Sequence, residues 1–335
     1  MRIALYDVDS KIPNLALMKL SAYHKERGDS IEWYMPLMRD HYDKIYASKV
    51  FAYSDGDLDP SRMEIGGTGW SLTKTLPLEI ERLRPDCSLY EFRHSMGFTM
   101  RGCRLNCPFC VVPQKEGKPQ ATATIDEIWT QRDSDFVILL DNDFFGNPQW
   151  ANRITEIQKH SLRVNFSQGL NIRLITDEQA KALASVRFRN LSNKKNQVHF
   201  AWDNFRQERM IRAGIERCLE AGLMPWQMAF YVLVGYDSTE EDDLHRITVL
   251  RDYGCDPYVM PYYSTDPYQR RLARWTNHKA IFKSVPWGEY RVGIKRKHLT
   301  VRATGPCLYD ARSEAEREES PADRGGRKEN DERIH

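Results

Sequence analysis

Hydrophobic residues change their spacing repeatedly along the chain, and the changes predict strands that alternate with helices. The first apolar run, residues 2–7, is typical of a buried strand, and residues 14–28 then carry an apolar stripe at helical spacing that ends at Gly28. Three more strand patterns follow, the last of which runs into a glycine-rich turn, at residues 30–36, 44–51 and 63–69. Strands separated by helix-sized segments predict a parallel sheet.

The alternation becomes regular after residue 92, where strand and helix patterns recur roughly every 30 residues. Strand patterns begin near residues 97, 135, 162, 197, 228 and 256. Helical patterns between them cover residues 124–132, 149–160, 176–184, 205–222 and 239–254. Six successive units predict an α/β fold with a partial (β/α)6 barrel of the TIM type, in which the chemistry lies at the carboxyl ends of the strands. An open doubly wound sheet is the alternative architecture.

These patterns divide the chain into four parts. Residues 1–92 form a small Rossmann-like α/β domain, residues 93–265 form the barrel, and residues 266–310 form a basic cap after the regular alternation ends. The cap is interpreted as a solvated surface, with a phosphate- or nucleic-acid-binding edge as the alternative. Residues 311–335 are almost all charged or small, which predicts a disordered tail.

Composition and charge narrow the setting in which the chain works. Of its 335 residues 41% are hydrophobic, enough for a substantial core, and the formal net charge of +2 gives no global field that would attract nucleic acid. The sequence shows neither an apolar leader nor a membrane-length apolar run, so no membrane partner is expected. Seven cysteines are too few and too scattered for a disulfide scaffold, which predicts a reducing, cytoplasmic location. Four isolated cysteines are predicted to be packing residues: Cys87, Cys218, Cys255 and Cys307.

The other three cysteines stand close together in the segment TMRGCRLNCPFCVVPQKEG, residues 99–117. Cys103, Cys107 and Cys110 form a C-x3-C-x2-C pattern, which turns three thiolates toward one point only if the chain loops around it. Two prolines are expected to keep this loop from becoming a helix. A zinc site needs a fourth ligand, and the nearest upstream histidine is His94, so zinc is disfavoured. Three soft thiolates with one ligand missing favour an iron–sulfur cluster that has an open iron.

This loop, with the aromatic Phe109 directly before the third cysteine, resembles the signature of the radical S-adenosylmethionine (SAM) enzymes, and the similarity covers about residues 95–265. The resemblance implies that the three cysteines hold a 4Fe-4S cluster whose open iron binds SAM. It also implies an electron donor such as flavodoxin or ferredoxin, and reductive cleavage of SAM to a 5′-deoxyadenosyl radical that modifies a substrate. A nucleotide or nucleic acid, a peptide and a small metabolite all remain open as substrates.

The resemblance further implies that groups at the strand ends contact SAM. The residues in this chain that match such positions are Phe109, Asp141, Asn142, Ser167, Gln168, Arg173, Asp203 and Gly235. Many members of the family have a glycine-glycine-glutamate stretch after the second strand. Here Asp141, Asn142 and Asp143 take its place and would supply oxygen acceptors instead.

Several of these groups have a purely structural alternative. The acidic turn after the second strand would then cap a helix that starts at Pro148, and Arg173 would form a surface ion pair. Asp203 would cap the helix that follows the fourth strand. Residues 238–242 contain the elements of a capping box and need not contact any ligand.

The N-terminal unit resembles the cobalamin-binding-like domain that often precedes a radical SAM barrel. The lower-ligand motif of that domain, Asp-x-His-x-x-Gly, is missing, because DVDSKIP contains neither His nor Gly and His24 lies too far along the helix. Cobalamin is therefore not expected, and the unit is interpreted as a domain that packs on the barrel or shapes the substrate entrance. The alternative functions are a cobalamin-dependent radical SAM methyltransferase and a non-catalytic metal- or nucleic-acid-binding module.

Overall fold

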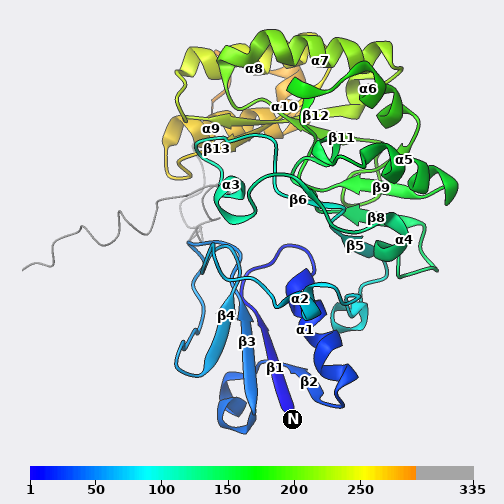
Figure 1. Cartoon of the computed structure of the whole chain (residues 1–335). Helices are drawn as coiled ribbons and strands as arrows, with labels where there is room; N and C mark the ends of the chain where they lie inside the picture. The colour runs from blue at the N-terminus through cyan, green and yellow to red at the C-terminus, as the bar shows by residue number, and fades with distance from the viewer. Residues whose placement is uncertain (292–335) are drawn as a thin grey trace, which may run out of the picture.

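The computed structural model describes residues 1–291, and its first part is a small parallel sheet with a long helix beside it (Figure 1). The strands lie in the order β2–β1–β3–β4 and span β1 (Arg2–Asp7), β2 (Ser30–Trp33), β3 (Lys44–Ser48) and β4 (Met63–Gly66). Helix α1 (Leu15–Glu26) begins where Asn14 Oδ1 accepts hydrogen bonds from two amides of its first turn, and its Leu17 packs on Ile3 and Leu5 of β1. The predicted parallel α/β unit is confirmed.

A longer series of parallel strands follows in chain order. Strands β5, β8 and β9 pair in succession with β10 beyond β9, strands β11, β12 and β13 pair in succession, and a single bridge from Leu170 to Phe200 joins the two groups. Within residues 1–291 no ladder joins β13 to β5, so the series is open at its ends. The bounds are β5 (Ser95–Gly97), β8 (Phe136–Leu139), β9 (Arg163–Phe166), β10 (Arg187–Phe188), β11 (Val198–Ala201), β12 (Met228–Val234) and β13 (Asp256–Pro261).

Helices alternate with these strands (Figure 1), and residues of both contribute to the largest core cluster. Phe200 of β11 and Phe230 of β12 belong to this cluster together with Ile215 and Leu250 from two of the helices, because alternate strand residues face the same side. The helices are α4 (Ile125–Ile128), α5 (Trp150–Lys159), α6 (Asp177–Ala184), α7 (Glu208–Glu220), α8 (Glu240–Asp252), α9 (Pro267–Asn277) and α10 (Lys279–Ser284).

Short strands and helical turns lie between the main elements, and two of them differ from the sequence prediction. The strand expected from residue 97 is instead β5 followed by β6 (Met100–Arg101), which forms an antiparallel hairpin with β7 (Gln120–Ala121). The cysteine loop does contain a helical turn, α3 (Val112–Lys115), because Pro113 stands in its first turn, where a proline needs no amide donor. The remaining connectors are α2 (Leu78–Glu81) and the 3₁₀ helices at Pro36–His41, Cys87–Tyr90, Phe144–Gly146, Ile172–Leu174, Phe205–Gln207 and Pro225–Gln227.

A shared hydrophobic cluster joins the N-terminal sheet unit to the later strands. Met18 of α1 and Cys87 pack with Met96 of β5 and with Phe136 and Ile138 of β8. The predicted boundary near residue 92 therefore lies inside a packed junction rather than in an exposed linker. The prediction that isolated cysteines are packing residues is confirmed for three of the four: Cys87, Cys218 and Cys255.

Other sequence predictions concern segments at or beyond the end of this description. Cys307, the predicted tail at 311–335 and residues 292–310 of the predicted cap lie outside the described residues. The part of the cap that is described forms α9 and α10, two helices that meet at His278. None of the helices in residues 1–291 is both long enough and apolar enough to cross a membrane.

Candidate functional site

The three clustered cysteines lie on a loop whose two ends are held together by β6 and β7. Met100 pairs with Ala121 and Arg101 with Gln120, in antiparallel register. Gly102 enters the loop with φ +83°, and a Cβ there would come within 2.3 Å of the Lys118 carbonyl oxygen. Only glycine accommodates both the left-handed backbone and the close approach of the returning chain. The sequence thus closes the loop independently of any bound group.

Inside the loop the cysteines are partly buried and face a polar surrounding. The Cys110 amide donates to the Cys107 carbonyl at 3.0 Å, and the Leu105 amide donates to Cys103 Sγ at 3.4 Å. Burial raises the pKa of Cys103 and raises that of Cys110 to about 11, and neighbouring thiolates add to both shifts. These two thiols are therefore protonated at neutral pH until a metal displaces the protons.

The donors that the loop offers are three cysteine thiols, a ligand type used by both zinc and iron–sulfur sites. Within the described part of the chain, no three His, Cys, Asp or Glu side chains converge closely enough to hold one metal ion. In a 4Fe-4S cluster each cysteine binds a different iron, so the thiolates surround the cluster instead of meeting at a point. Three half-buried thiols spaced along one closed loop suit an arrangement in which the thiolates surround a cluster.

A partly buried ion pair fastens the loop to the turn after β8. Arg104 Nε donates to Asp143 Oδ2 at 2.6 Å and its Nη2 donates to Asp143 Oδ1 at 2.9 Å, a bidentate contact. The Asp143 side chain is only 1% exposed, and its hydrogen bonds to the guanidinium raise the pKa of Arg104. The pair thus brings the residue after Cys103 to the carboxyl edge of the parallel strands.

Aromatic rings fasten the same loop to the far side of the strand series. The Phe109 ring meets Tyr236, which follows β12, edge to face at 5.2 Å between centroids. Tyr236 in turn lies 4.9 Å from Tyr262, which follows β13. The loop therefore contacts the carboxyl ends of β8 and β12, strands that are separated by β9 and β11 in the series.

The acidic turn after β8 does not cap the next helix. Both oxygens of the buried Asp141 accept hydrogen bonds from the segment after β5, from the Thr99 and Met100 amides at 2.7 and 3.0 Å and from the Thr99 hydroxyl. Asn142 donates to Glu116 at 2.9 Å, and α5 begins after Gln149 without a side-chain cap. In this structure Asp141 joins strands, and burial raises its pKa to about 6.

Polar residues after β9 are brought to the same edge. Arg173 donates to two neutral amides, Asn171 at 3.3 Å and Gln207 at 2.7 Å, and within residues 1–291 it forms no ion pair. The predicted alternative of a surface ion pair is therefore wrong for the described residues. The buried Nδ2 atom of Asn171 has no hydrogen-bond partner among residues 1–291. Ser167 is partly exposed and Gln168 is exposed, so both remain accessible.

Asp203 follows β11 and carries an acidic group near the cysteines. Desolvation raises its pKa, while the positive charges of Arg173 and Arg246 act in the opposite direction. Its charge also contributes to the raised pKa of Cys110, so the two side chains are neighbours. Asn204 caps the helical turn that follows, because its Oδ1 accepts a hydrogen bond from the Arg206 amide. The alternative prediction, that Asp203 is the capping residue, is therefore wrong.

Gly235 ends β12 in a conformation that only glycine tolerates well. Its φ is +79°, and a Cβ would lie 2.0 Å from Nε2 of Gln269 on α9. The capping box expected after it is present, with Thr239 and Asp242 exchanging hydrogen bonds at the start of α8. Thr239 and Asp242 therefore cap the helix, which is the structural role predicted as the alternative to ligand contact.

Sequence reasoning missed two residues that organise this edge. Arg246 is fully buried on α8 and donates to the Trp202 and Leu233 carbonyls at 2.7 and 2.8 Å, which ties the ends of β11 and β12 together. Glu116, in the cysteine loop, accepts hydrogen bonds from both the Gly102 amide and Asn142. The position of Arg246, next to Ile247 and four residues before Leu250, was a signal for the first, because both of these apolar residues are buried on α8. Nothing local marks the second.

Comparison of the sequence with protein-family models gives no match, and a search of curated proteins finds no significant relative.

Proposed function

We propose that this chain is a radical SAM enzyme, in which Cys103, Cys107 and Cys110 hold a 4Fe-4S cluster and the open iron binds SAM. One observation carries the proposal: the closed C-x3-C-x2-C loop is fastened by Arg104 and Phe109 to the carboxyl edge of a parallel strand series. Carboxyl edges are where parallel α/β folds assemble their sites. A structural metal site would not need strand-end polar groups around it.

The finer architecture proposed is a partial (β/α)6 barrel. The order β5–β8–β9 and β11–β12–β13, with a bridge between the groups, supports six parallel units that follow one another as they do in the sequence. Their lack of a closing ladder within residues 1–291 suits a partial barrel, whose open side admits a large substrate.

Two charged side chains are the best candidates to hold SAM. Within residues 1–291 the side-chain hydrogen bonds of Arg173 go to neutral amides and not to a carboxylate, so its guanidinium can pair with a carboxylate such as that of the methionine moiety. Asp203 lies near Cys110 and offers oxygens to an amine or to ribose hydroxyls. When bound, the cluster supplies the electron that cleaves SAM and so gives access to hydrogen abstraction from the substrate. The chain orients SAM by these two charges, and the rings of Phe109 and Tyr236 keep water from the loop.

The N-terminal unit gives no support to cobalamin chemistry. His24 is 5% exposed, and its two ring nitrogens lie 2.7 Å from Asp29 and 3.0 Å from the Tyr46 hydroxyl. A histidine so occupied is unavailable as a metal ligand. We therefore favour a radical SAM enzyme without cobalamin over the methyltransferase.

Anaerobic reconstitution with iron and sulfide tests the proposal. The wild-type protein should gain a brown chromophore with about four irons per chain, and with reductant and SAM it should release 5′-deoxyadenosine, measured by mass spectrometry. Cys107→Ala should lose the cluster and the product, whereas Cys87→Ala, outside the loop, should retain both. A colourless zinc protein that is indifferent to SAM would refute the proposal.

A further inference from the structure

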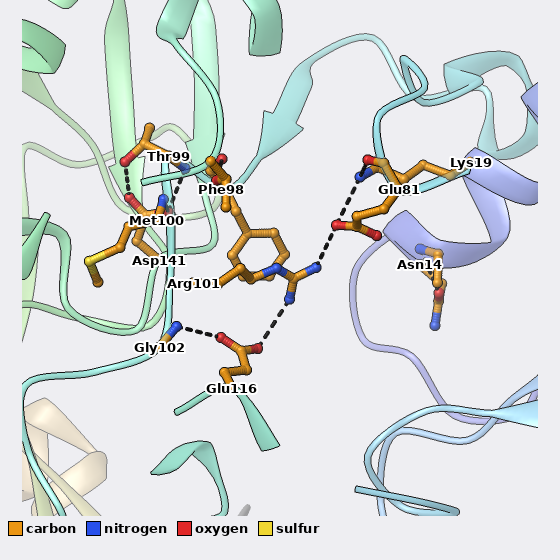
Figure 2. Close-up of polar contacts among 12 residues, drawn as sticks. Asn14, Lys19, Glu81, Phe98, Thr99, Met100, Arg101, Gly102, Glu116 and Asp141 are labelled. Atoms are coloured by element: carbon orange, nitrogen blue, oxygen red, sulfur yellow. Dashed lines mark hydrogen bonds and ion pairs between the residues drawn. The ribbon is translucent and has the colours of Figure 1, made fainter. Parts of the chain in front are cut away.

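A chain of alternating charges runs from the N-terminal unit into the cysteine loop (Figure 2). At its centre is Arg101, the last residue of β6 and two positions before Cys103. Its guanidinium lies between two carboxylates, with Nη2 donating to Glu81 at 3.0 Å and Nη1 donating to Glu116 at 3.1 Å, and it stacks over the Phe98 ring at 3.5 Å. Three contacts fix the position of this side chain.

On the loop side, Glu116 gathers three separate segments. Its second oxygen, Oε2, accepts from the Gly102 amide at 3.0 Å and from Asn142 Nδ2 at 2.9 Å. One carboxylate therefore joins Arg101, the glycine at the loop entrance and the turn after β8. The Glu116 side chain is 14% exposed, so these contacts are only partly screened by water.

On the other side, Glu81 at the end of α2 belongs to the N-terminal unit. Its carboxylate lies 3.1 Å from Lys19 Nζ on α1, and the same ammonium donates to the Glu81 carbonyl. Lys19 is 8% exposed, and burial is the largest of the effects that lower its pKa. Glu81 is thus shared between a buried cation of its own unit and the guanidinium beside the cysteine loop.

A second contact joins the N-terminal unit to the other end of the loop. Lys115 of α3, beyond the last cysteine, donates to the Thr68 hydroxyl in the glycine-rich turn after β4. In that turn Gly67 has φ +97°, and a Cβ there would come within 2.2 Å of the Lys49 carbonyl oxygen, so the turn itself is tightly fixed. The unit touches the loop both before and after the cysteines.

We infer that Arg101 is a positioning residue, through which Glu81 and the N-terminal unit hold the cysteine loop in its closed form. The role proposed for the N-terminal unit is to clamp the loop rather than to carry a cofactor. Any effect of the clamp on a bound cluster rests on the proposed function. The clamp on the loop itself does not, because its contacts are present in the cluster-free protein.

Hydrogen exchange of the full-length, cluster-free protein tests the clamp directly. Glu81→Gln keeps the shape of the side chain but removes its charge, so the amides of residues 102–117 should exchange about tenfold faster, the effect of losing one hydrogen bond to a charged partner. Arg101→Gln should accelerate the same amides at least as much. Glu79→Gln, on the same helix and exposed, is the matched control and should change nothing.

Two further measurements separate a clamp from general destabilisation. In Glu81→Gln the amides of β12 should exchange at the wild-type rate, and the double variant Glu81→Gln/Arg101→Gln should exchange its loop no faster than Arg101→Gln alone. Iodoacetamide should label Cys107 faster in both single variants. Unchanged loop exchange and labelling in Glu81→Gln would overturn the inference. Failure of wild type to take up iron and sulfide would refute the proposed function and leave the exchange result intact.

For the reconstituted protein, the clamp predicts a spectroscopic change. Arg101→Lys retains the positive charge but cannot form a fork to two carboxylates, so it should restore only part of the loop protection. If the loop seats a cluster, the electron paramagnetic resonance signal of its reduced form should broaden or shift in Glu81→Gln and stay unchanged in Glu79→Gln. Identical spectra for the two variants would contradict the clamp acting on the cluster.

Discussion

The ion pair between Arg104 and Asp143 predicts an asymmetry between two alanine variants. Arg104→Ala leaves a carboxylate that is 1% exposed without its cation, and unpaired buried charges of this kind cost about 3–5 kcal/mol. Asp143→Ala leaves a guanidinium whose side chain is 27% exposed and can turn toward water, so it loses only charge-assisted hydrogen bonds, about 1.5–3 kcal/mol. Arg104→Ala should therefore be the more destabilised variant, by about 1–2 kcal/mol between the centres of these ranges.

Urea unfolding of the cluster-free protein at pH 7, followed by tryptophan fluorescence, measures this difference. The double variant Arg104→Ala/Asp143→Ala removes both charges and should be more stable than Arg104→Ala alone. Arg132→Ala is the control, because Arg132 is exposed and lies 3.9 Å from Asp126; its loss should cost under about 1 kcal/mol. A double variant as unstable as Arg104→Ala, or the reverse order of the single variants, would refute the reasoning.

Three further variants address residues at the same edge. Burial raises the pKa of Asp141 to about 6, above its unfolded value near 4, so between these pH values the native protein binds more protons than the unfolded chain. Relative to Asp141→Asn, wild type should therefore lose about 2 kcal/mol of stability as pH rises from 4 to 6, measured by urea unfolding. Gly235→Ala should lower the free energy of unfolding by about 1–3 kcal/mol, measured by thermal melting, because φ is +79° there and the new Cβ would clash with Gln269. Phe109→Ala removes the ring contact with Tyr236 and should speed alkylation of the loop thiols, measured by mass spectrometry.

Each of these variants has a matched control elsewhere in the chain. Asp133→Asn alters an exposed carboxylate and should leave the pH profile parallel to that of wild type. Gly288→Ala adds a methyl group where nothing lies within 4 Å, so its melting temperature should equal that of wild type. Tyr258→Ala removes a ring that is 49% exposed, away from the loop, and should not change thiol labelling. A control that matches its test variant would contradict the corresponding prediction.

Strands β8 and β12 could be predicted because each is an apolar run, as a buried parallel strand requires. Residues 228–234 of β12 are almost all buried, and their hydrophobic character is visible without any partner. The two-residue strand β10 and the β6–β7 hairpin have no comparable signal, since their stability comes from neighbours far along the chain. The strand expected at residue 97 was displaced for that reason.

The candidate site was predicted in outline, because strand ends converge in any parallel fold, but individual roles were not. Asp141 and Asp143 are chemically alike and two residues apart, yet one accepts from backbone amides and the other pairs with Arg104. Arg173 could not be assigned from its neighbours, because its partner Gln207 comes from a later element. Such choices depend on contacts between residues more than thirty positions apart, which local patterns do not encode.

The hairpin of β6 and β7 has a consequence for how the cysteine loop would acquire a bound group. Bringing together the ends of a free segment as long as residues 101–120 costs about 2–3 kcal/mol in chain entropy. Because Arg101 already pairs with Gln120, that cost is met when the protein folds and not when a ligand arrives. Loading should therefore behave as the filling of a preorganised receptacle, with a small heat-capacity change, rather than as binding coupled to folding.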